Sequence, residues 1–242
     1  MKGIILAGGH GTRLMPLTKV TSKQLLPIYN QPMVYYPLKT LLAAGIRDIL
    51  FIVAPDHAGD FLKLLGSGKD FGARFAFEVQ DKPEGLAQAF IIGKEFIDND
   101  NVCMILGDNI FEDDFSDAIR NFKSGGLIFA KQVPDPERFG QVRFDSNMNA
   151  VEIREKPKKA ISSYAIPGLY VYDSRVVEIA KKVKPSGRGE LEITDLHNWY
   201  LKKGELKVKI VKGEWIDAGT FESLFRATQL ARRKSLRDEN KK

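Results

Sequence analysis

The chain has 242 residues, of which 43% are hydrophobic and 28% charged, a composition typical of a globular protein with a sizeable core. No stretch approaches the ~18 consecutive apolar residues of a membrane span, and the apolar run at residues 4–7 is too short for a secretion signal. Cys103 is the only cysteine and lies in an apolar run, so it forms no internal disulfide. We therefore expect a cytoplasmic protein that does not associate with a membrane.

The net charge of +6 is concentrated at the end of the chain, where residues 232–242 carry six basic and two acidic side chains. Nucleic-acid-binding proteins usually concentrate basic residues on a folded face, so nucleic acid is not an expected partner. The small remaining excess of positive charge suits a small anionic substrate. We predict one domain at residues 1–231, followed by a basic, solvent-exposed tail at residues 232–242.

In the first half of the chain, short apolar runs alternate with helical patterns. Strands are predicted at residues 3–7, 48–53, 75–79 and 102–106. Helices are predicted at residues 34–44, 57–65 and 86–96. Repeated strand–helix–strand units indicate a mainly parallel sheet with helices on both faces.

The pattern changes after about residue 125. Successive strands are predicted at residues 127–133, 140–144, 150–154 and 164–172. Helices at 174–183 and 192–202, a strand at 206–211 and a helix at 221–232 follow. The fold class is therefore α/β, with a mixed, mainly parallel sheet that continues through both halves.

The turn after the first strand, GGHGTRL at residues 8–14, has the composition of a phosphate-binding loop. Glycines let backbone N–H groups approach a polyphosphate closely, and Arg13 adds a forked cationic donor. No Gly-Lys-Ser/Thr follows, and Leu14 stands where a dinucleotide fingerprint has its third glycine. These absences weigh against a kinase, an ATPase and a dehydrogenase. By itself, the turn is also compatible with a tight loop that binds nothing.

Three further charged residues follow apolar segments at the same expected edge of the sheet. Lys23 comes soon after the glycine-rich turn; a loop lysine is usually solvated, but one held here could reach a phosphate. Asp108 follows the strand at 102–106, and Asp217 follows Trp215 and Ile216. Carboxylates at strand ends suit Mg²⁺, although a helix N-cap or a turn is the alternative role for Asp108.

Taken together, these segments resemble the sugar nucleotidyltransferase family. The resemblance begins with residues 8–14 and KQLLP at 23–27. It continues in order with GLAQA at 85–89, LGDN at 106–109, EKP at 155–157, GLY at 168–170, RGELEITD at 188–195 and WIDAGT at 215–220. The match extends from residue 2 to about residue 231.

The resemblance implies a Rossmann-like fold with a nucleotide-binding half at about residues 1–125 and a sugar-binding half at about 126–231. It also implies that a sugar 1-phosphate attacks the α-phosphorus of a nucleoside triphosphate in line, with Mg²⁺, to give a nucleotide sugar and pyrophosphate. The segments at 85–89 and 188–192 are most similar to the thymidylyltransferase branch. This branch implies dTTP and glucose 1-phosphate as substrates, within dTDP-rhamnose-type nucleotide-sugar biosynthesis. The alternatives are UTP or another sugar 1-phosphate, or a non-catalytic regulatory homologue that binds nucleotide sugars.

The resemblance also assigns roles to individual residues. Arg13 and Lys23 are implied to hold the triphosphate, Lys156 to align the sugar phosphate, and Asp108 and Asp217 to bind the metal. The implied nucleotide contacts are Gly8, Gly11, Thr12, Arg13, Gln24, Gln80 and Gly85. The implied sugar-phosphate contacts are Asn109, Gly140, Glu155, Lys156, Ile166, Tyr170 and Arg188. Without the resemblance, Gln80 would be interpreted as a surface residue and Tyr170 as a core residue.

Two departures from the family pattern bear on these expectations. Pro167 stands where the family usually has threonine, which removes a hydrogen-bond donor beside the sugar site. Many family members continue into a C-terminal helical segment that helps build a regulatory nucleotide site between subunits. Because this chain ends at residue 242, we expect neither that site nor a tetramer, and we predict a homodimer.

Overall fold

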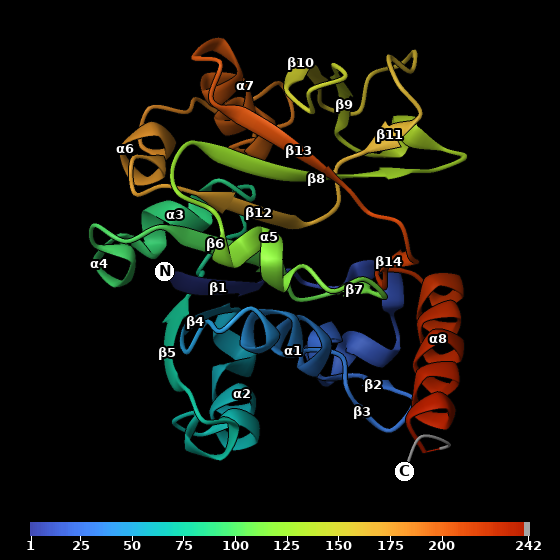
Figure 1. Cartoon of the computed structure of the whole chain (residues 1–242). Helices are drawn as coiled ribbons and strands as arrows, with labels where there is room; N and C mark the ends of the chain where they lie inside the picture. The colour runs from blue at the N-terminus through green and yellow to red at the C-terminus, as the bar shows by residue number, and fades with distance from the viewer. Residues whose placement is uncertain (240–242) are drawn as a thin grey trace.

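The computed structural model describes residues 1–239, and in that part of the chain it contains one ten-stranded mixed sheet (Figure 1). The strand order is β10-β9-β11-β8-β12-β6-β1-β4-β5, with β13 paired to β8. Strands β10, β11 and β12 run against the others, so the predicted mainly parallel mixed sheet is confirmed. The strands are β1 (Lys2–Ala7), β4 (Asp48–Val53), β5 (Arg74–Val79), β6 (Val102–Leu106), β8 (Gly126–Gln132), β9 (Gln141–Phe144), β10 (Ala150–Arg154), β11 (Tyr164–Ala165), β12 (Leu169–Tyr172) and β13 (Leu206–Ile210).

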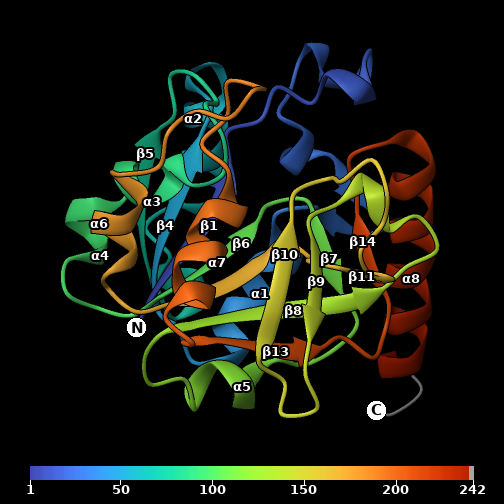
Figure 2. The same ribbon diagram turned by 90° about the horizontal axis from the view of Figure 1, so that it is seen from above.

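Helices cover both faces of this sheet, as Figures 1 and 2 show. The helices of the sheet are α1 (Tyr35–Ala43), α2 (Ala58–Leu65), α3 (Gln88–Ile92), α4 (Lys94–Ile97), α5 (Ser116–Arg120), α6 (Val176–Ala180) and α7 (Ile193–Lys202). Successive residues of a strand point to opposite faces, so β1 supplies Ile4 to one core and Ile5 to the other. The first core includes residues of α3, α6 and α7, and the second includes residues of α1, α2 and α5.

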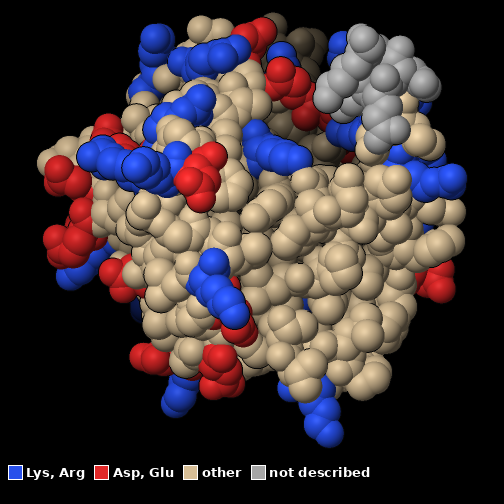
Figure 3. All heavy atoms as spheres, turned by 90° about the horizontal axis from the view of Figure 1, so that it is seen from below, with Lys and Arg blue, Asp and Glu red and all other residues tan. Residues whose placement is uncertain are grey.

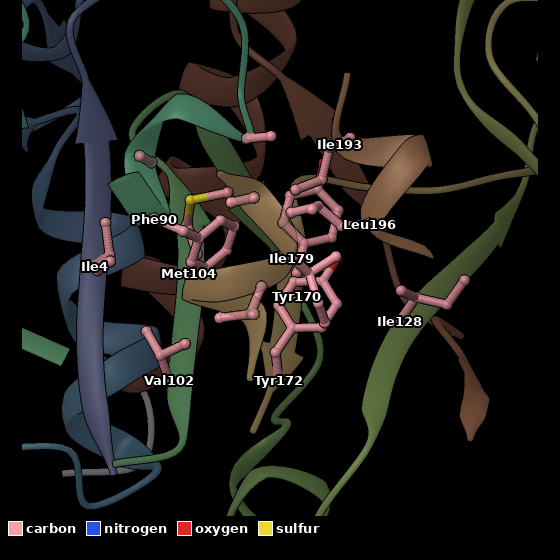
Figure 4. Close-up of a cluster of buried hydrophobic side chains, with 14 of the residues drawn as sticks. Ile4, Phe90, Val102, Met104, Ile128, Tyr170, Tyr172, Ile179, Ile193 and Leu196 are labelled. Carbon is pink, nitrogen blue, oxygen red and sulfur yellow. The ribbon is translucent and has the colours of Figure 1, made fainter. Parts of the chain in front are cut away.

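The core beneath α7 forms one wall of the functional site described below. Figure 4 shows Tyr170 and Tyr172 of β12 on the same side of the sheet as Leu196 of α7. The rings of Tyr172 and Phe90 meet edge to face with their centroids 5.4 Å apart. This contact packs β12 against α3, and the stacked rings of Tyr172 and Tyr200, with centroids 5.3 Å apart, pack β12 against α7.

A small two-stranded ribbon joins the end of the chain to the centre of the molecule. In it, β7 (Asn109–Phe111) pairs with β14 (Trp215–Asp217), and this register places Asp217 opposite Asn109. The final helix α8 (Phe221–Glu239) packs on this ribbon and on the hairpin β2 (Pro27–Ile28) and β3 (Gln31–Pro32). The ribbon therefore brings a residue from the end of the chain next to the carboxyl end of β6.

Three predicted elements differ from the structure. The helix predicted at 86–96 is divided into α3 and α4 at Gly93, and the strand predicted at 164–172 is divided into β11 and β12 by residues 166–168. Pro167 lies in that break, where it has no N–H to donate to a neighbouring strand. The helix predicted at 174–183 is confined to α6.

The predicted basic tail is largely part of α8, which continues past residue 232 to Glu239. Lys234 Nζ donates to the carbonyl oxygens of Phe111 and Glu112, and Arg233 forms an ion pair with Glu214. These contacts dock the helix on β7 and its surroundings instead of leaving it to fray from residue 232. Residues 240–242 of the predicted tail lie outside the described residues.

Two further observations concern the helices and the charged surface of the described residues. None of the helices in the described residues is both long and apolar enough to cross a membrane. On the face shown in Figure 3, Lys and Arg side chains lie mainly toward the margin and are interspersed with Asp and Glu around a broad uncharged area.

Candidate active site

Two adjoining cavities open at the carboxyl ends of the parallel strands, where ligands bind in open α/β sheets. The first cavity, of about 220 Å³, is lined by the predicted residues Lys23, Gln24, Gln80, Gly85 and Asp108. The second cavity, of about 290 Å³, is lined by every predicted sugar-phosphate residue and by Arg13 and Asp217. Leu86, Leu106 and Glu190 line both cavities, so the two form one continuous site.

The first cavity is built around a close approach between Gly8 and Gln80. A Cβ atom on Gly8 would lie 2.1 Å from Gln80 Oε1, so only glycine leaves room for this buried amide. Gln80 Nε2 donates to Gln88 Oε1 at 2.6 Å, and the same oxygen accepts from the backbone N–H of Glu84 at 3.0 Å. Gln88, which the sequence did not single out, thereby fixes the orientation of the Gln80 amide.

Gly85 joins the wall of the first cavity to the segment before α7. Its φ is 114°, and a Cβ atom there would lie 2.5 Å from both the backbone N and O of Leu191. Leu191 N donates to Glu84 O at 2.6 Å, and Ala87 N donates to Leu191 O at 3.1 Å. Residues 84–87 and Leu191 therefore form one tightly packed unit that needs glycine at position 85.

Substitution of Gly85 by alanine is expected to lower the free energy of unfolding by about 2 to 5 kcal/mol, because left-handed strain and backbone overlap add together. The matched control is Gly72→Ala, since Gly72 also has a positive φ (63°) but no atom within 4 Å of its added Cβ. The control should cost only about 1 to 2 kcal/mol. Urea unfolding compares the two, and equal losses would show that the contact with Leu191 is unimportant.

The other predicted nucleotide residues lie nearby but differ in their placement. Gly11 adopts a left-handed conformation with φ of 64°, and Thr12, which is exposed, begins a short 3₁₀ turn. Gln24 is buried, and its Oε1 accepts a hydrogen bond from Ser22 Oγ at 2.6 Å. Gly9 lines the first cavity, whereas Gly8, Gly11 and Thr12 are not part of its lining.

Asp108 and Asp217 lie together where the two cavities meet. Asp108 follows β6, Asp217 ends β14, and Ala218 N donates to Asp108 O at 2.9 Å. Lys23 forms a hydrogen-bonded ion pair with Asp108. Burial opposes both charges, but the ion pair outweighs it, so the pKa of Lys23 is raised and that of Asp108 is lowered.

For Asp217, burial outweighs the attraction of nearby cations, so its pKa is raised. Burial, and after it the negative charge of Asp108, raises the pKa of Asp217 to about 6. Its Oδ1 atom is buried and has no hydrogen-bond partner among the described residues. Two adjacent carboxylates, one of them with an unpartnered oxygen, are suited to a hard divalent cation that completes its shell with phosphate oxygens and water. The described residues hold no group of three or more His, Cys, Asp or Glu side chains able to form a complete protein cage.

Two cations of the second cavity, Lys156 and Arg188, are paired with carboxylates. Arg188 forms ion pairs with Glu155 at 3.2 Å and Glu192 at 2.8 Å, and a longer one with Glu190 at 3.4 Å. Lys156 Nζ lies 3.7 Å from Glu155 Oε1. Burial is the main cause of the raised pKa of Glu155, and the nearby charge of Glu192 adds to it. An anion bound here would therefore compete with carboxylates for Arg188.

A family model for nucleotidyl transferases matches residues 2–234 of the chain. The chain belongs to the nucleotidyl transferase family. Glucose-1-phosphate thymidylyltransferase of Neisseria meningitidis is 56% identical over 94% of this chain and 81% of its own length. The enzyme of that name from Mycolicibacterium smegmatis is 52% identical over 98% of this chain and 84% of its own length.

Solved structures agree with this family membership. A chain from Bacillus anthracis, assigned as a glucose-1-phosphate thymidylyltransferase and crystallised with sucrose, is 50% identical, with a TM-score of 0.90 over 96% of this chain and 95% of its own. UDP-glucose pyrophosphorylase complexed with UDP-glucose is 22% identical, with a TM-score of 0.85 over 96% of this chain and 98% of its own, and it supports the fold alone. The predicted enzyme class and Rossmann-like fold are confirmed. Nucleotidyltransferases of this family typically use a divalent metal ion.

In this nucleotidyltransferase, the predicted sugar-phosphate residue Asn109 is occupied by internal hydrogen bonds. Its Oδ1 accepts from Gly168 N at 2.9 Å and from Trp215 Nε1 at 2.7 Å. Its Nδ2 donates to Asp108 Oδ1 at 3.1 Å. Asn109, the first residue of β7, therefore connects the turn after β6, the segment before β12 and β14 at the cavity wall, a role that the sequence did not indicate.

The remaining predicted residues form the wall of the second cavity. Ile166 N donates to Gly140 O at 2.7 Å, which extends the pairing of β9 and β11 at the cavity wall. Tyr170 is only 2% exposed, so it is a core residue as well as a wall residue. Sequence reasoning missed Arg138, Glu190, Glu192, Thr194 and His197, which also line this cavity. Glu190 and Glu192 follow Arg188 in the segment RGELE, and that charge pattern was the available signal.

Proposed function

We propose that this nucleotidyltransferase is a glucose-1-phosphate thymidylyltransferase, which converts dTTP and glucose 1-phosphate into dTDP-glucose and pyrophosphate with Mg²⁺. The observation that carries the proposal is the similarity to enzymes of that name, at 56% identity over 94% of the chain. Two adjoining cavities with an acidic pair at their junction support it, because the reaction needs two anionic substrates beside a divalent cation.

In the proposed reaction, a phosphate oxygen of glucose 1-phosphate attacks the α-phosphorus of dTTP. The bond from the α-phosphorus to the bridging oxygen breaks, and that oxygen leaves with its electron pair as part of pyrophosphate. The nucleophile is already an anion, so no general base is required. The barrier arises mainly from repulsion between anions, and catalysis consists of positioning and electrostatic stabilisation.

The first cavity is proposed to hold the nucleotide. Gln80 offers an amide that can match both a donor and an acceptor on a pyrimidine edge, and Gln88 fixes its orientation. Lys23 and Arg13 are proposed to hold the triphosphate and the leaving pyrophosphate, with backbone N–H groups of Gly8, Gly11 and Thr12 beside them. Gly85 is proposed to let the base approach the backbone.

The second cavity is proposed to hold glucose 1-phosphate. Lys156 adopts φ of 37°, a left-handed conformation uncommon outside glycine, and this conformation positions its side chain at the cavity wall. Lys156 and Arg188 are proposed to hold the phosphate, which would replace the carboxylates as the ion-pair partner of Arg188. Glu155, released from Arg188, is then free to accept hydrogen bonds from sugar hydroxyls.

Asp108 and Asp217 are proposed to hold Mg²⁺. When bound, the ion supplies positive charge that neutralises phosphate oxygens of the triphosphate. The contribution of the protein is the pair of buried carboxylates, and Lys23 keeps Asp108 ionised through their ion pair. A metal ion held by Asp108 would share this carboxylate with Lys23, so metal binding would be coupled to the position of a lysine proposed to hold phosphate.

Pyrophosphate release by the purified chain with glucose 1-phosphate and Mg²⁺ tests the proposal. We expect turnover with dTTP to exceed turnover with UTP, CTP, ATP or GTP, and to stop on chelation of the metal. Turnover mainly with UTP would keep the mechanism and overturn the nucleotide assignment. If none of the nucleotides is turned over, direct binding of dTDP-glucose distinguishes a non-catalytic regulatory homologue from an enzyme for another sugar 1-phosphate.

Three further expectations from the sequence also stand as proposals. A homodimer is proposed, and light scattering that detects only monomer would contradict it. A cytoplasmic location is proposed from the presence of a single, free cysteine. Residues 1–231 are proposed to act as one domain, made of the two halves on a shared sheet and followed by residues 232–242.

A further inference from the structure

His197 is a buried polar residue on the wall of the second cavity that the proposed mechanism does not use. It lies in the second turn of α7, has no solvent exposure, and lines the cavity together with Tyr170 and Thr194. Its Nδ1 atom shares a hydrogen bond of 2.6 Å with the hydroxyl of Tyr172. Its Nε2 atom is buried and has no hydrogen-bond partner among the described residues.

An unpartnered nitrogen in this position has a cost that an apolar side chain would avoid. A buried polar atom without a partner costs about 1 to 3 kcal/mol, and such atoms are therefore rare in folded proteins. The surroundings of His197 are aromatic, with ring centroids at 5.3 Å for Tyr170 and 6.0 Å for Tyr172. Burial lowers the pKa of His197 to about 3, so the imidazole is neutral and retains one donor and one acceptor nitrogen.

The position of His197 places it beside the expected sugar. A Cβ atom on Gly140 would lie 3.2 Å from Glu155 Oε2 and 3.3 Å from Thr194 Cγ2, so Thr194 and Glu155 meet at the same wall. His197 follows Thr194 by three residues and therefore lies on the same face of α7, one turn further along. The cations Lys156 and Arg188 line the same cavity.

We infer that His197 Nε2 is a specificity determinant that forms a hydrogen bond with one hydroxyl of the sugar bound in the second cavity. The inference rests on the proposed function and extends it to a residue of the sugar site. Either tautomer serves: if Tyr172 donates to Nδ1, Nε2 carries the proton and donates, and in the reverse case Nε2 accepts. A sugar hydroxyl can complete both arrangements, whereas a deoxy position, which has no oxygen, can complete neither.

The test compares glucose 1-phosphate with its 2-, 3-, 4- and 6-deoxy analogues in the wild type and in His197→Leu. In the wild type, the analogue that lacks the partner hydroxyl should lose about 3- to 10-fold in kcat/KM through this hydrogen bond. In His197→Leu that loss should disappear for that analogue alone. For the other three analogues, the ratio of kcat/KM to that of glucose 1-phosphate should be the same as in the wild type. His197→Gln, which restores a polar group at similar reach, should recover part of the discrimination.

A purely structural role for His197 predicts a different result. Leucine would then change the melting temperature and overall activity but leave all four analogue ratios unchanged, and this outcome overturns the inference. A wild type that does not turn over glucose 1-phosphate with dTTP overturns the proposed function instead, so the two failures are distinct.

If neither variant folds, ¹⁵N-histidine spectra of the wild type provide the test. The chain has three histidines, and substitution of His10 and His57 assigns the signals of His197. Its Nε2 signal should shift when glucose 1-phosphate binds and should fail to shift with one deoxy analogue. The same shift with all four analogues would contradict a direct hydrogen bond.

Discussion

Replacement of Asp217 by asparagine is expected to reduce Mg²⁺-dependent turnover by at least about 1000-fold, because it removes one of two carboxylates proposed to hold the ion. The free energy of unfolding of this variant should be equal to or higher than that of the wild type. Among the described residues, Asp217 Oδ1 is buried and has no hydrogen-bond partner, and Asp217 lies close to the negative charge of Asp108, so loss of its own charge relieves repulsion. Pyrophosphate release and urea unfolding measure the two quantities separately.

The neighbouring substitution Asp108→Asn should abolish turnover as well, but for two reasons that activity alone cannot separate. It removes a proposed metal ligand, and it also leaves the largely buried Lys23 ammonium, whose side chain is 14% exposed, without its carboxylate. Breaking a buried ion pair by removing one partner typically costs about 3 to 5 kcal/mol, so this variant should be less stable than the wild type. Asp217→Asn is therefore the more informative variant, and near-normal turnover in both would refute the metal assignment.

The positions of the strands, and hence the edge at which the cavities open, followed from local sequence patterns. The runs at 3–7, 48–53 and 102–106 differ by at most one residue from β1, β4 and β6. These strands are buried on both faces, and continuous apolar runs make that burial visible in the sequence. Because the carboxyl ends of parallel strands share one edge, residues 8–14 and Asp108 could be expected to meet.

Features that depend on contacts between distant segments could not be inferred in this way. The interpretation of Asn109 as a sugar contact missed its hydrogen bonds to Gly168 and Trp215, which are separated from it by many residues in sequence. Likewise, the extension of α8 past residue 232 depends on Phe111 and Glu112 as acceptors for Lys234. Local propensity contains no information on such partners, since tertiary contacts decide them.

Two predicted elements, the helix at 86–96 and the strand at 164–172, are each divided in the structure. Each contains a residue that could have indicated the break. Gly93 interrupts the apolar pattern of residues 86–96, and Pro167 interrupts that of residues 164–172. Both residues weaken regular structure, but an apolar run on each side favoured one continuous element.

His197 had no such local signal in the sequence, because a single histidine in an apolar helix is expected to be a core residue. Only the cavity and the unpartnered Nε2 atom mark it as different.

Removal of the Arg13 side chain in Arg13→Ala is expected to lower kcat/KM by about 100- to 1000-fold, the usual effect of losing one preorganised contact to developing charge. Arg13 is exposed, and its Nη2 atom would lie 2.9 Å from a Cβ on Gly219, which places the guanidinium beside the Asp217 segment. Among the described residues, its side chain has no ion pair that the substitution would break, so the melting temperature should not change. Arg13→Lys keeps the charge but loses the forked geometry, and we expect about a 10-fold loss.

Arg226 provides a matched control for this prediction. It is also an exposed arginine, and it lines a neighbouring cavity together with Arg13 and Asp217. If the positive charge of the region acted only by long-range attraction of the anionic substrates, Arg226→Ala and Arg13→Ala would lose similar activity, and both losses would shrink at high salt. A direct contact between Arg13 and the triphosphate predicts instead that Arg226→Ala stays within about 3-fold of the wild type, a change of less than 1 kcal/mol, while the loss in Arg13→Ala persists at high salt.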